Sequence, residues 1–412
     1  MTDRDAGERL SPTTVDQLRD AVRWAVSEEA PMELVGAGTK RSLGRPIQTK
    51  MTLDTRQFSG ISLYEPEELV MSARAATPLA EIEAALDAKG QELAFEPADY
   101  GPLYGGTPNA GTIGGVFAAN LSGPRRMKIG AARDHLLGLH AVSGRGEVFK
   151  TGGRVVKNVT GYDLCKLLTG AFGTLGVLTD VTFKVLPRSE AVRTLSVSGL
   201  SAADAVAAMT VALRSAVEPT GAAFLPSALG PDSSEIGDTG RLLIRIEGFS
   251  ASVDDRARTL TALLDKYGGV DSHDDAESRT LWRGIRDGAA FGSDTPLAQM
   301  ALWRVSVPPV AAPAILDTIR AAIPDMRYLI DWGGGLLWIA APEAADGGAD
   351  AIRGAIAASG GHATLIRGSS QLRSAVPVFQ PPAGPLLALS GRIKESFDPG
   401  RVLNPGRMYA GI

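Results

Sequence analysis

Two glycines, a hydroxyl and an ammonium follow one another near the N-terminus, in the segment Gly36-Ala37-Gly38-Thr39-Lys40. Glycines at this spacing let the backbone approach a ligand closely, because they carry no side chain. The threonine and lysine that follow can hydrogen-bond to an anion and neutralise its charge. The segment, called the first glycine loop below, therefore predicts an anion site that suits a diphosphate. The alternative is an ordinary turn between two strands.

The first glycine loop departs from the two commonest phosphate-binding motifs. A dinucleotide fingerprint of the GxGxxG type would need a third glycine where this chain has Arg41. Gly44 and Pro46 also interrupt the helix that should hold the phosphate in that motif. The spacing of glycine and lysine does not match a Walker loop either. We therefore expect neither a Rossmann fold nor a P-loop.

Two further glycine-rich runs follow, a second at 111–115 and a third at 170–177. Runs of this kind can offer successive backbone N–H groups to an extended ligand. Each run taken alone is also compatible with a tight turn between strands. Three separated runs together favour a long dinucleotide over a single phosphate.

The composition is that of an ordinary globular enzyme, with 44% hydrophobic and 21% charged residues in a chain of 412. A chain of this length predicts two domains. The net charge of −4 contains no long block of either sign, so we expect no nucleic-acid partner. The single cysteine, Cys165, excludes an internal disulfide and an iron–sulfur cluster held by this chain alone. We expect a cytoplasmic location and no direct membrane span.

The order of polar and apolar residues predicts an α+β chain with a change of style near Pro187. Before it, a helix should open after Thr14, and strands and a second helix should follow. The elements expected there are strands at 32–35, 50–54, 68–75, 136–142, 147–150 and 176–185, and a helix from 79 to 90.

Beyond Pro187 strands and helices alternate, which predicts an antiparallel sheet with helices over one face. Strands are expected at 193–197, 241–247 and 301–307, with helices opening near Ser201, Ser252 and Val310. We expect the segment at 101–123 to be a binding loop, because glycine, proline, asparagine and threonine dominate it.

Several segments together resemble the FAD-binding domain of flavoproteins of the vanillyl-alcohol oxidase type. They are 35–40, 111–120, 133–138, 157–164 and 172–179. The whole chain, including 302–308, 331–338 and 404–407, is similar to the family of FAD-binding E subunits of glycolate oxidase. The resemblance implies a two-part FAD-binding domain at 1–188, an α+β cap domain with an antiparallel sheet at 189–380, and a C-terminal segment at 381–412 that returns to the FAD domain.

The resemblance also implies which residues contact the cofactor. The first glycine loop and the second run would contact the pyrophosphate, the third run the adenosine side, and the turn at Asn404 the flavin. The implied FAD-binding residues are Gly36, Ala37, Gly38, Thr39, Lys40, Gly111, Thr112, Ile113, Gly114, Gly115, Asn120, Gly173, Thr174, Gly176, Val177 and Asn404.

The four histidines bear on two further expectations. Some proteins of this fold attach the flavin through a histidine in the first or second loop, but His135, His140, His273 and His362 lie outside both. We therefore expect non-covalent FAD. Catalytic members resembling the D subunit of glycolate oxidase carry a histidine-rich metal motif in the second domain, and this chain lacks one, so we expect no metal.

Oxidation of a 2-hydroxy acid also needs a cation to hold the substrate carboxylate. Arg304 and Arg245, each flanked by apolar residues on an expected strand, are the candidates, because a guanidinium binds a carboxylate through two parallel contacts. The alternative for each is a solvated strand face or an internal ion pair.

Three functions remain compatible with the sequence. The resemblance implies an FAD-binding subunit that supports oxidation of glycolate to glyoxylate, with a catalytic FAD subunit and an iron–sulfur subunit as partners and a location peripheral to the inner membrane through them. The second is a self-sufficient FAD-dependent dehydrogenase of another 2-hydroxy acid. The third is a largely structural, non-catalytic assembly subunit.

Overall fold

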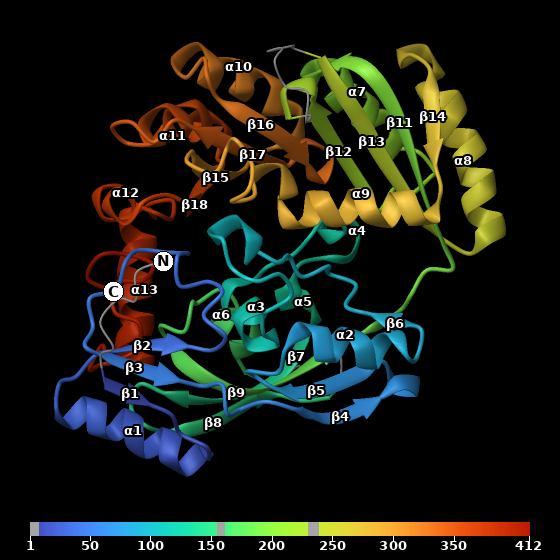
Figure 1. The fold of residues 1–412 in the computed structure, drawn as a ribbon. Helices are drawn as coiled ribbons and strands as arrows, with labels where there is room; N and C mark the ends of the chain where they lie inside the picture. The colour runs from blue at the N-terminus through green and yellow to red at the C-terminus, as the bar shows by residue number, and fades with distance from the viewer. Residues whose placement is uncertain (1–7, 155–160, 230–238) are drawn as a thin grey trace.

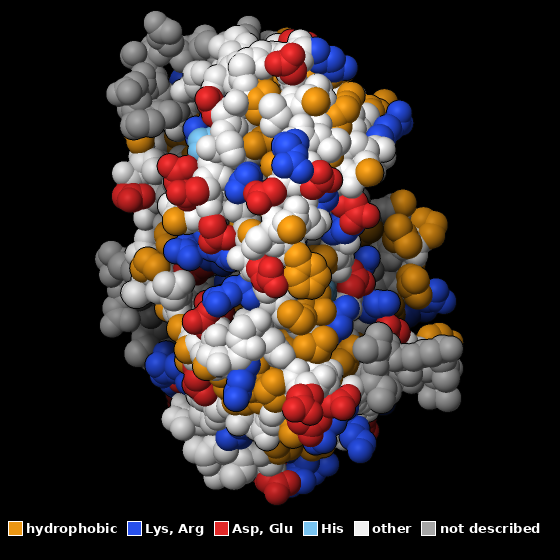
Figure 2. All heavy atoms as spheres, turned by 90° about the vertical axis from the view of Figure 1, so that its right-hand side faces the viewer, with side chains coloured by type: hydrophobic (Ala, Val, Ile, Leu, Met, Phe, Trp, Pro, Cys, Tyr) orange, Lys and Arg blue, Asp and Glu red, His pale blue; other side chains and the backbone are white. Residues whose placement is uncertain are grey.

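The computed structural model describes residues 8–154, 161–229 and 239–412. Figure 1 shows two parts stacked on each other, with the N-terminal sheets below and one large sheet above. Half of the expected motif at 157–164 and most of the segment at 226–240 fall outside the described residues. On the face in Figure 2, basic and acidic side chains are interspersed, with no continuous basic patch.

The lower part opens with a small parallel sheet of three strands, β1 (Glu8–Leu10), β3 (Met51–Asp54) and β2 (Met32–Val35), in that order. Helix α1 (Val15–Ser27) precedes β2, and its N-cap Thr14 accepts a hydrogen bond from the N–H of Gln17 at 3.2 Å. Leu18 and Val22 of this helix are fully buried. The predicted first helix and the strand after it are confirmed.

A second sheet of five strands completes the lower part, and its neighbouring strands are antiparallel. Helices α2 (Leu79–Asp87) and α3 (Ile113–Ala119) contribute to its core. The strands, in spatial order, are β4 (Ile61–Glu65), β5 (Val70–Arg74), β9 (Gly176–Lys184), β7 (Leu136–Ser143) and β8 (Val148–Gly152). Two sheets in one unit confirm the two-part architecture predicted for the FAD domain.

The upper part is built on one antiparallel sheet of eight strands, as predicted for the cap domain. Its first strand begins four residues after β10 (Leu186–Pro187), so the predicted boundary at 188 falls between the two. The spatial order is β14 (Val270–His273), β11 (Ala191–Ser201), β13 (Thr239–Gly248), β12 (Gly221–Pro226), β16 (Arg327–Asp331), β17 (Leu336–Ala341), β15 (Ala301–Ser306) and β18 (His362–Arg367).

The two faces of the cap sheet are covered differently. Four helices contribute to the core on the outer face, namely α7 (Ala202–Leu213), α8 (Ser250–Leu264), α10 (Ala312–Ala322) and α11 (Ala349–Ile356). Helix α9 (Asp275–Asp287) lies on the inner face, between the sheet and the FAD domain (Figure 1). Its Trp282 and Ile285 belong to the core shared with the FAD domain, so the expectation of helices over one face only is wrong for α9.

After β18 the chain leaves the cap through α12 (Ser370–Ala375) and returns in α13 (Gly384–Phe397) to the lower part (Figure 1). There Leu403 pairs with Met32 in a parallel bridge beside β2. Among the described residues, no helix is both long and apolar enough to cross a membrane.

Candidate functional site

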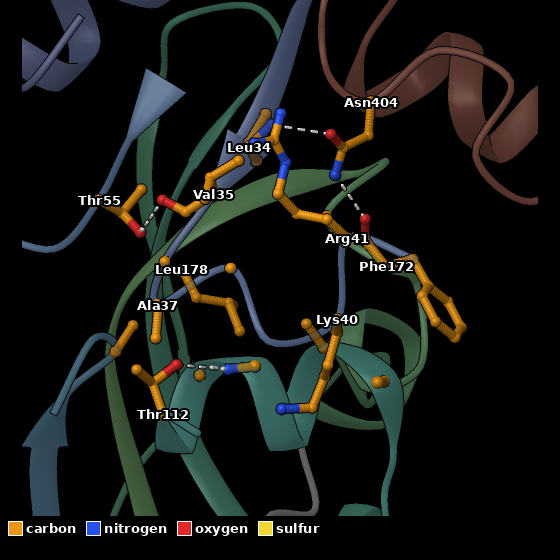
Figure 3. A pocket seen from close by; sticks show the side chains of 18 of the residues that line it. Leu34, Val35, Ala37, Lys40, Arg41, Thr55, Thr112, Phe172, Leu178 and Asn404 are labelled. Carbon is orange, nitrogen blue, oxygen red and sulfur yellow. Dashed lines mark hydrogen bonds between the residues drawn. The ribbon is translucent and has the colours of Figure 1, made fainter. Parts of the chain in front are cut away.

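A cleft lies between the first glycine loop, helix α3 and the turn at Asn404 (Figure 3). Its empty volume is about 860 Å³, including space open to solvent, and cofactor sites typically measure about 300–1,000 Å³. The predicted FAD-binding residues that line it are Gly36, Ala37, Gly38, Thr39, Lys40, Thr112, Gly114, Gly115, Gly173, Gly176, Val177 and Asn404. Segments from four distant parts of the sequence thus meet at one cavity.

Four predicted residues do not line this cleft. Ile113 is fully buried in the hydrophobic core, and the Thr174 hydroxyl donates to the carbonyl of Ala171. Asn120 accepts the N–H of Arg133 through its side chain. Gly111 lies beside Lys40, with its carbonyl accepting the N–H of Leu79. Their contact with the cofactor stays a prediction.

The cleft also contains residues that the sequence analysis did not select. Most lie within three residues of a selected residue in the chain, so a wider window around each selected residue would have included them. Thr55, at the end of β3, offered no signal of its own beyond its place after a predicted strand. The missed residues are Leu34, Val35, Arg41, Leu43, Thr55, Ala75, Ala118, Ala119, Phe172, Leu178 and Arg407.

The first glycine loop offers backbone donors to the cleft. None of the N–H groups from Ala37 to Lys40 donates a hydrogen bond to another residue in the described part of the chain. Gly38 has φ +78°, in the left-handed region that favours glycine. Backbone N–H groups left free beside a cavity are suited to an anionic ligand.

Lys40 places a positive charge in the same cleft. Its side chain extends from the loop toward α3, and Nζ has one hydrogen-bond partner in the described structure, the Thr39 hydroxyl at 3.3 Å (Figure 3). Burial lowers the pKa of Lys40 from 10.5 to about 8, against the opposing charge of Asp99. Lys40 is half-buried, and a partly desolvated ammonium that forms no ion pair with a described carboxylate is a site for an anion.

The second glycine run works differently from what we expected. The N–H groups of Ile113 and Gly114 already donate to the carbonyls of Thr77 and Ala75, and that of Gly115 donates to the Thr112 hydroxyl. These N–H groups are therefore not free for a ligand, because Thr112 caps α3 and the helix is tied to β5. An added Cβ at Gly114 would lie 2.6 Å from the Ala75 oxygen, so this glycine is required for close packing.

The C-terminal turn holds the first glycine loop in place. Asn404 accepts the N–H of Leu34 through Oδ1 at 2.8 Å and donates through Nδ2 to the carbonyl of Phe172 at 2.7 Å (Figure 3). Arg407 is buried and donates to the carbonyls of Arg41 and Leu43 at 3.0 and 3.3 Å. The walls of the cleft are thereby joined across more than 360 residues of sequence.

Comparisons with known proteins agree with this geometry. A profile for the family described as FAD binding domain matches residues 9–152. The glycolate oxidase subunit GlcE of Escherichia coli (strain K12) is 34% identical over 395 residues, which cover 95% of this chain and 97% of that protein. The chain belongs to the GlcE family. Its cofactor is therefore FAD, and it is an FAD-dependent oxidoreductase subunit.

More distant proteins share parts of the sequence or the fold with this GlcE family member. The glycolate oxidase subunit GlcD of Bacillus subtilis (strain 168) is 29% identical over 45% of this chain and 38% of its own length. The 4-ethylphenol oxidase from Gulosibacter chungangensis superposes with a TM-score of 0.71 at 17% identity, covering 99% and 91% of the two chains. A p-cresol methylhydroxylase gives 0.71 at 15% identity, with 97% and 88% covered. The fold is that of the vanillyl-alcohol oxidase type, as predicted.

The two candidate arginines of this GlcE family member have different surroundings, although both lie on the inner face of the cap sheet. Arg245 binds the Glu96 carboxylate through two contacts of 2.8 and 3.1 Å and lies over the ring of Trp282. Burial alone would raise the pKa of Glu247, but Arg245 and Arg125 lower it to about 2. The contacts of Arg245 favour the internal ion pair over a substrate contact. Arg304 has no such partner and is considered below.

None of the four histidines lines the cleft. His273 forms a hydrogen bond between Nε2 and the Ser196 hydroxyl at 2.9 Å. Its Nδ1 lies 3.6 Å from Oε2 of Glu277. The glutamate four residues after His273 was a pairing signal that the sequence analysis overlooked. Across residues 8–154, 161–229 and 239–412, no group of three or more potential ligands is arranged to hold a metal ion.

Proposed function

We propose that this chain is the FAD-carrying subunit of a glycolate oxidase complex and supports oxidation of glycolate to glyoxylate. The proposal depends on the position of Lys40, whose half-buried ammonium lies beside free backbone N–H groups in a cleft lined by glycines. The similarity to GlcE along nearly the whole chain supports glycolate as the substrate of the assembly.

The residues present fit the cofactor. Lys40 and the N–H groups of the first glycine loop would hold the pyrophosphate, while Gly36 and Gly38, where an added Cβ would meet nothing closer than 3.5 and 3.7 Å, leave room for close approach. FAD, when bound, supplies the hydride acceptor for alcohol oxidation. The chain's own residues would bind FAD and fix its orientation in the cleft. No described histidine lines the cleft, which supports non-covalent binding.

The proposal includes partners. We infer a GlcD-type catalytic FAD subunit and an iron–sulfur subunit as electron acceptor, because glycolate oxidase subunits GlcE and GlcD are both among the similar proteins. A single cysteine gives this chain at most one thiolate ligand, too few for a cluster of its own. The complex would work in the cytoplasm and reach the inner membrane through these partners.

The visible spectrum of the purified chain tests the proposal. We expect a yellow protein whose flavin stays oxidised in anaerobic glycolate when the chain is alone and bleaches in the assembled complex. Bleaching of the isolated chain would instead establish a self-sufficient dehydrogenase. A colourless chain that still assembles its partners would establish the structural subunit.

Lys40 also predicts how FAD affinity depends on pH. Its pKa in the free protein is lowered to about 8, and a bound pyrophosphate would raise it. Only the protonated form attracts the anion, so affinity is full below pH 8 and falls as the pH rises above it. We expect the dissociation constant to rise by about tenfold per pH unit between about pH 8 and 9.5.

Fluorescence titration of the apoprotein with FAD at a series of pH values measures this slope. Lys40→Met should bind FAD more weakly at pH 7 and show little change between pH 8 and 9.5. An unchanged slope in that variant would mean that another group titrates.

A further inference from the structure

Arg304 faces the FAD domain from the middle of the cap sheet. On β15 its neighbours Trp303 and Val305 point into the core under the outer helices, so alternation places Arg304 on the inner face. In register it lies between Trp338 of β17 and Thr364 of β18. The residue is partly exposed, so solvent reaches it from one side.

Two of the three nitrogens of the Arg304 guanidinium have no partner among the residues that the structure describes. Its Nε and Nη2 atoms are buried and have no hydrogen-bond acceptor within the described residues. Its Cζ lies 4.7 Å from the ring centroid of Trp332, and Cζ of Arg126 lies 4.5 Å from the same centroid. Buried N–H groups without acceptors are costly, and those on a cation more so. Two cations thus lie against one indole.

A carboxyl that interacts electrostatically with Arg304 on this face, that of Asp331, is a weak counter-ion. Asp331, at the end of β16, is buried, and its Oδ1 accepts the N–H of Trp332 at 2.7 Å. Burial raises its pKa to about 7, so a large part of this carboxyl is neutral near pH 7. The positive charge of Arg304 and Arg126 is therefore only partly balanced.

Arg245 shows that arginines on the inner face do not in general lack hydrogen-bond acceptors. It stands on the same side of the same sheet, also over a tryptophan, and its donors are satisfied by Glu96 and Thr220. The chain therefore supplies acceptors to one arginine of the pair and leaves the other without them.

We propose that Arg304 binds the carboxylate of a small 2-hydroxy acid, with Arg126 adding positive charge from the FAD domain. A planar guanidinium can hold both carboxylate oxygens through parallel hydrogen bonds, which fixes the orientation of the acid. Trp332, whose indole N–H donates to the carbonyl of Gly123 at 3.1 Å, forms the wall between the two cations and links the domains. This chain then meets the substrate itself, an inference that rests on the proposed glycolate oxidase function.

Oxalate tests the site without turnover, because it carries two carboxylates and no oxidisable C–H bond. Its dissociation constant is measured by calorimetry on the FAD-loaded chain and on the assembled complex. Arg304→Met should weaken oxalate binding by about 10- to 100-fold, with unchanged FAD content. Arg304→Lys keeps the charge and loses the planar pair of donors. Its dissociation constant for oxalate should lie between those of the wild type and Arg304→Met.

Arg353→Met is the matched control. Arg353 also lies over a tryptophan, Trp303, at 5.0 Å and has a buried Nε without a partner, but it belongs to α11 on the outer face. Equal oxalate affinity in the wild type and Arg304→Met, equal weakening in Arg353→Met, or no oxalate binding by the wild type would each overturn the inference. If one of these results overturns the role of Arg304, bleaching of the flavin by glycolate in the assembled complex would still support the proposed function.

Discussion

Gly38→Val is expected to give a folded protein that purifies without FAD. Gly38 has φ +78°, a conformation that a β-branched residue adopts only under strain. The added Cβ would meet only ordinary contacts, 3.7 Å from Arg41 and Val35, so the chain without cofactor has room for it. Gly38 lines the cleft, however, so the same side chain would stand beside the free N–H groups of the loop. The ratio of flavin to protein absorbance after gel filtration measures the effect.

The control separates backbone strain from loss of the binding site. Gly90, after α2, also has a positive φ, +63°, and an added Cβ there meets no atom within 4 Å. The control variant is therefore Gly90→Val. Strain at either glycine should cost about 1–3 kcal/mol of stability, so Gly38→Val and Gly90→Val should both unfold at a lower urea concentration than the wild type. Only Gly38→Val should lose FAD. Normal yellow protein from it would show that the first glycine loop does not hold the pyrophosphate.

Lys394→Met is expected to lower the free energy of unfolding by about 3–5 kcal/mol, the typical cost of leaving a buried charge without its partner. Lys394 and Asp398 are both almost fully buried and lie 2.6 Å apart. The Lys394 ammonium also donates to the carbonyls of Thr174 and Leu403. Without it, Asp398 keeps only the N–H groups of Val402 and Leu403.

Urea unfolding followed by tryptophan fluorescence measures this loss. Lys166→Met is the control, because Lys166 forms an exposed pair with Asp163 at 3.5 Å, and such pairs contribute about 0–1 kcal/mol. The double variant Lys394→Met with Asp398→Asn should recover part of the stability, since no buried charge is left unpaired. Equal free energies of unfolding for Lys394→Met and Lys166→Met would show that the buried pair of Lys394 and Asp398 does not stabilise the fold as expected.

The sequence predicted those features that depend on local residue type. The first glycine loop was selected because two further glycine runs in the same chain favoured a dinucleotide over an ordinary turn, and the cap sheet was predicted because its strands and helices alternate. The sequence could not predict which face of the cap sheet α9 covers, because an apolar stripe on a helix can pack on either face of a sheet. The contrast between Arg304 and Arg245 was also hidden, since Glu96, the partner of Arg245, lies 149 residues away.

The bonds from Asn404 and Arg407 to the first glycine loop have a consequence for biosynthesis. The ribosome makes this loop early, but the residues that hold it emerge only after all eight strands of the cap. The nascent N-terminal domain therefore reaches the cytosol with its cofactor loop unsupported, and contacts so distant in sequence form slowly. FAD capture should then be a late, post-translational event that reports completion of the whole chain.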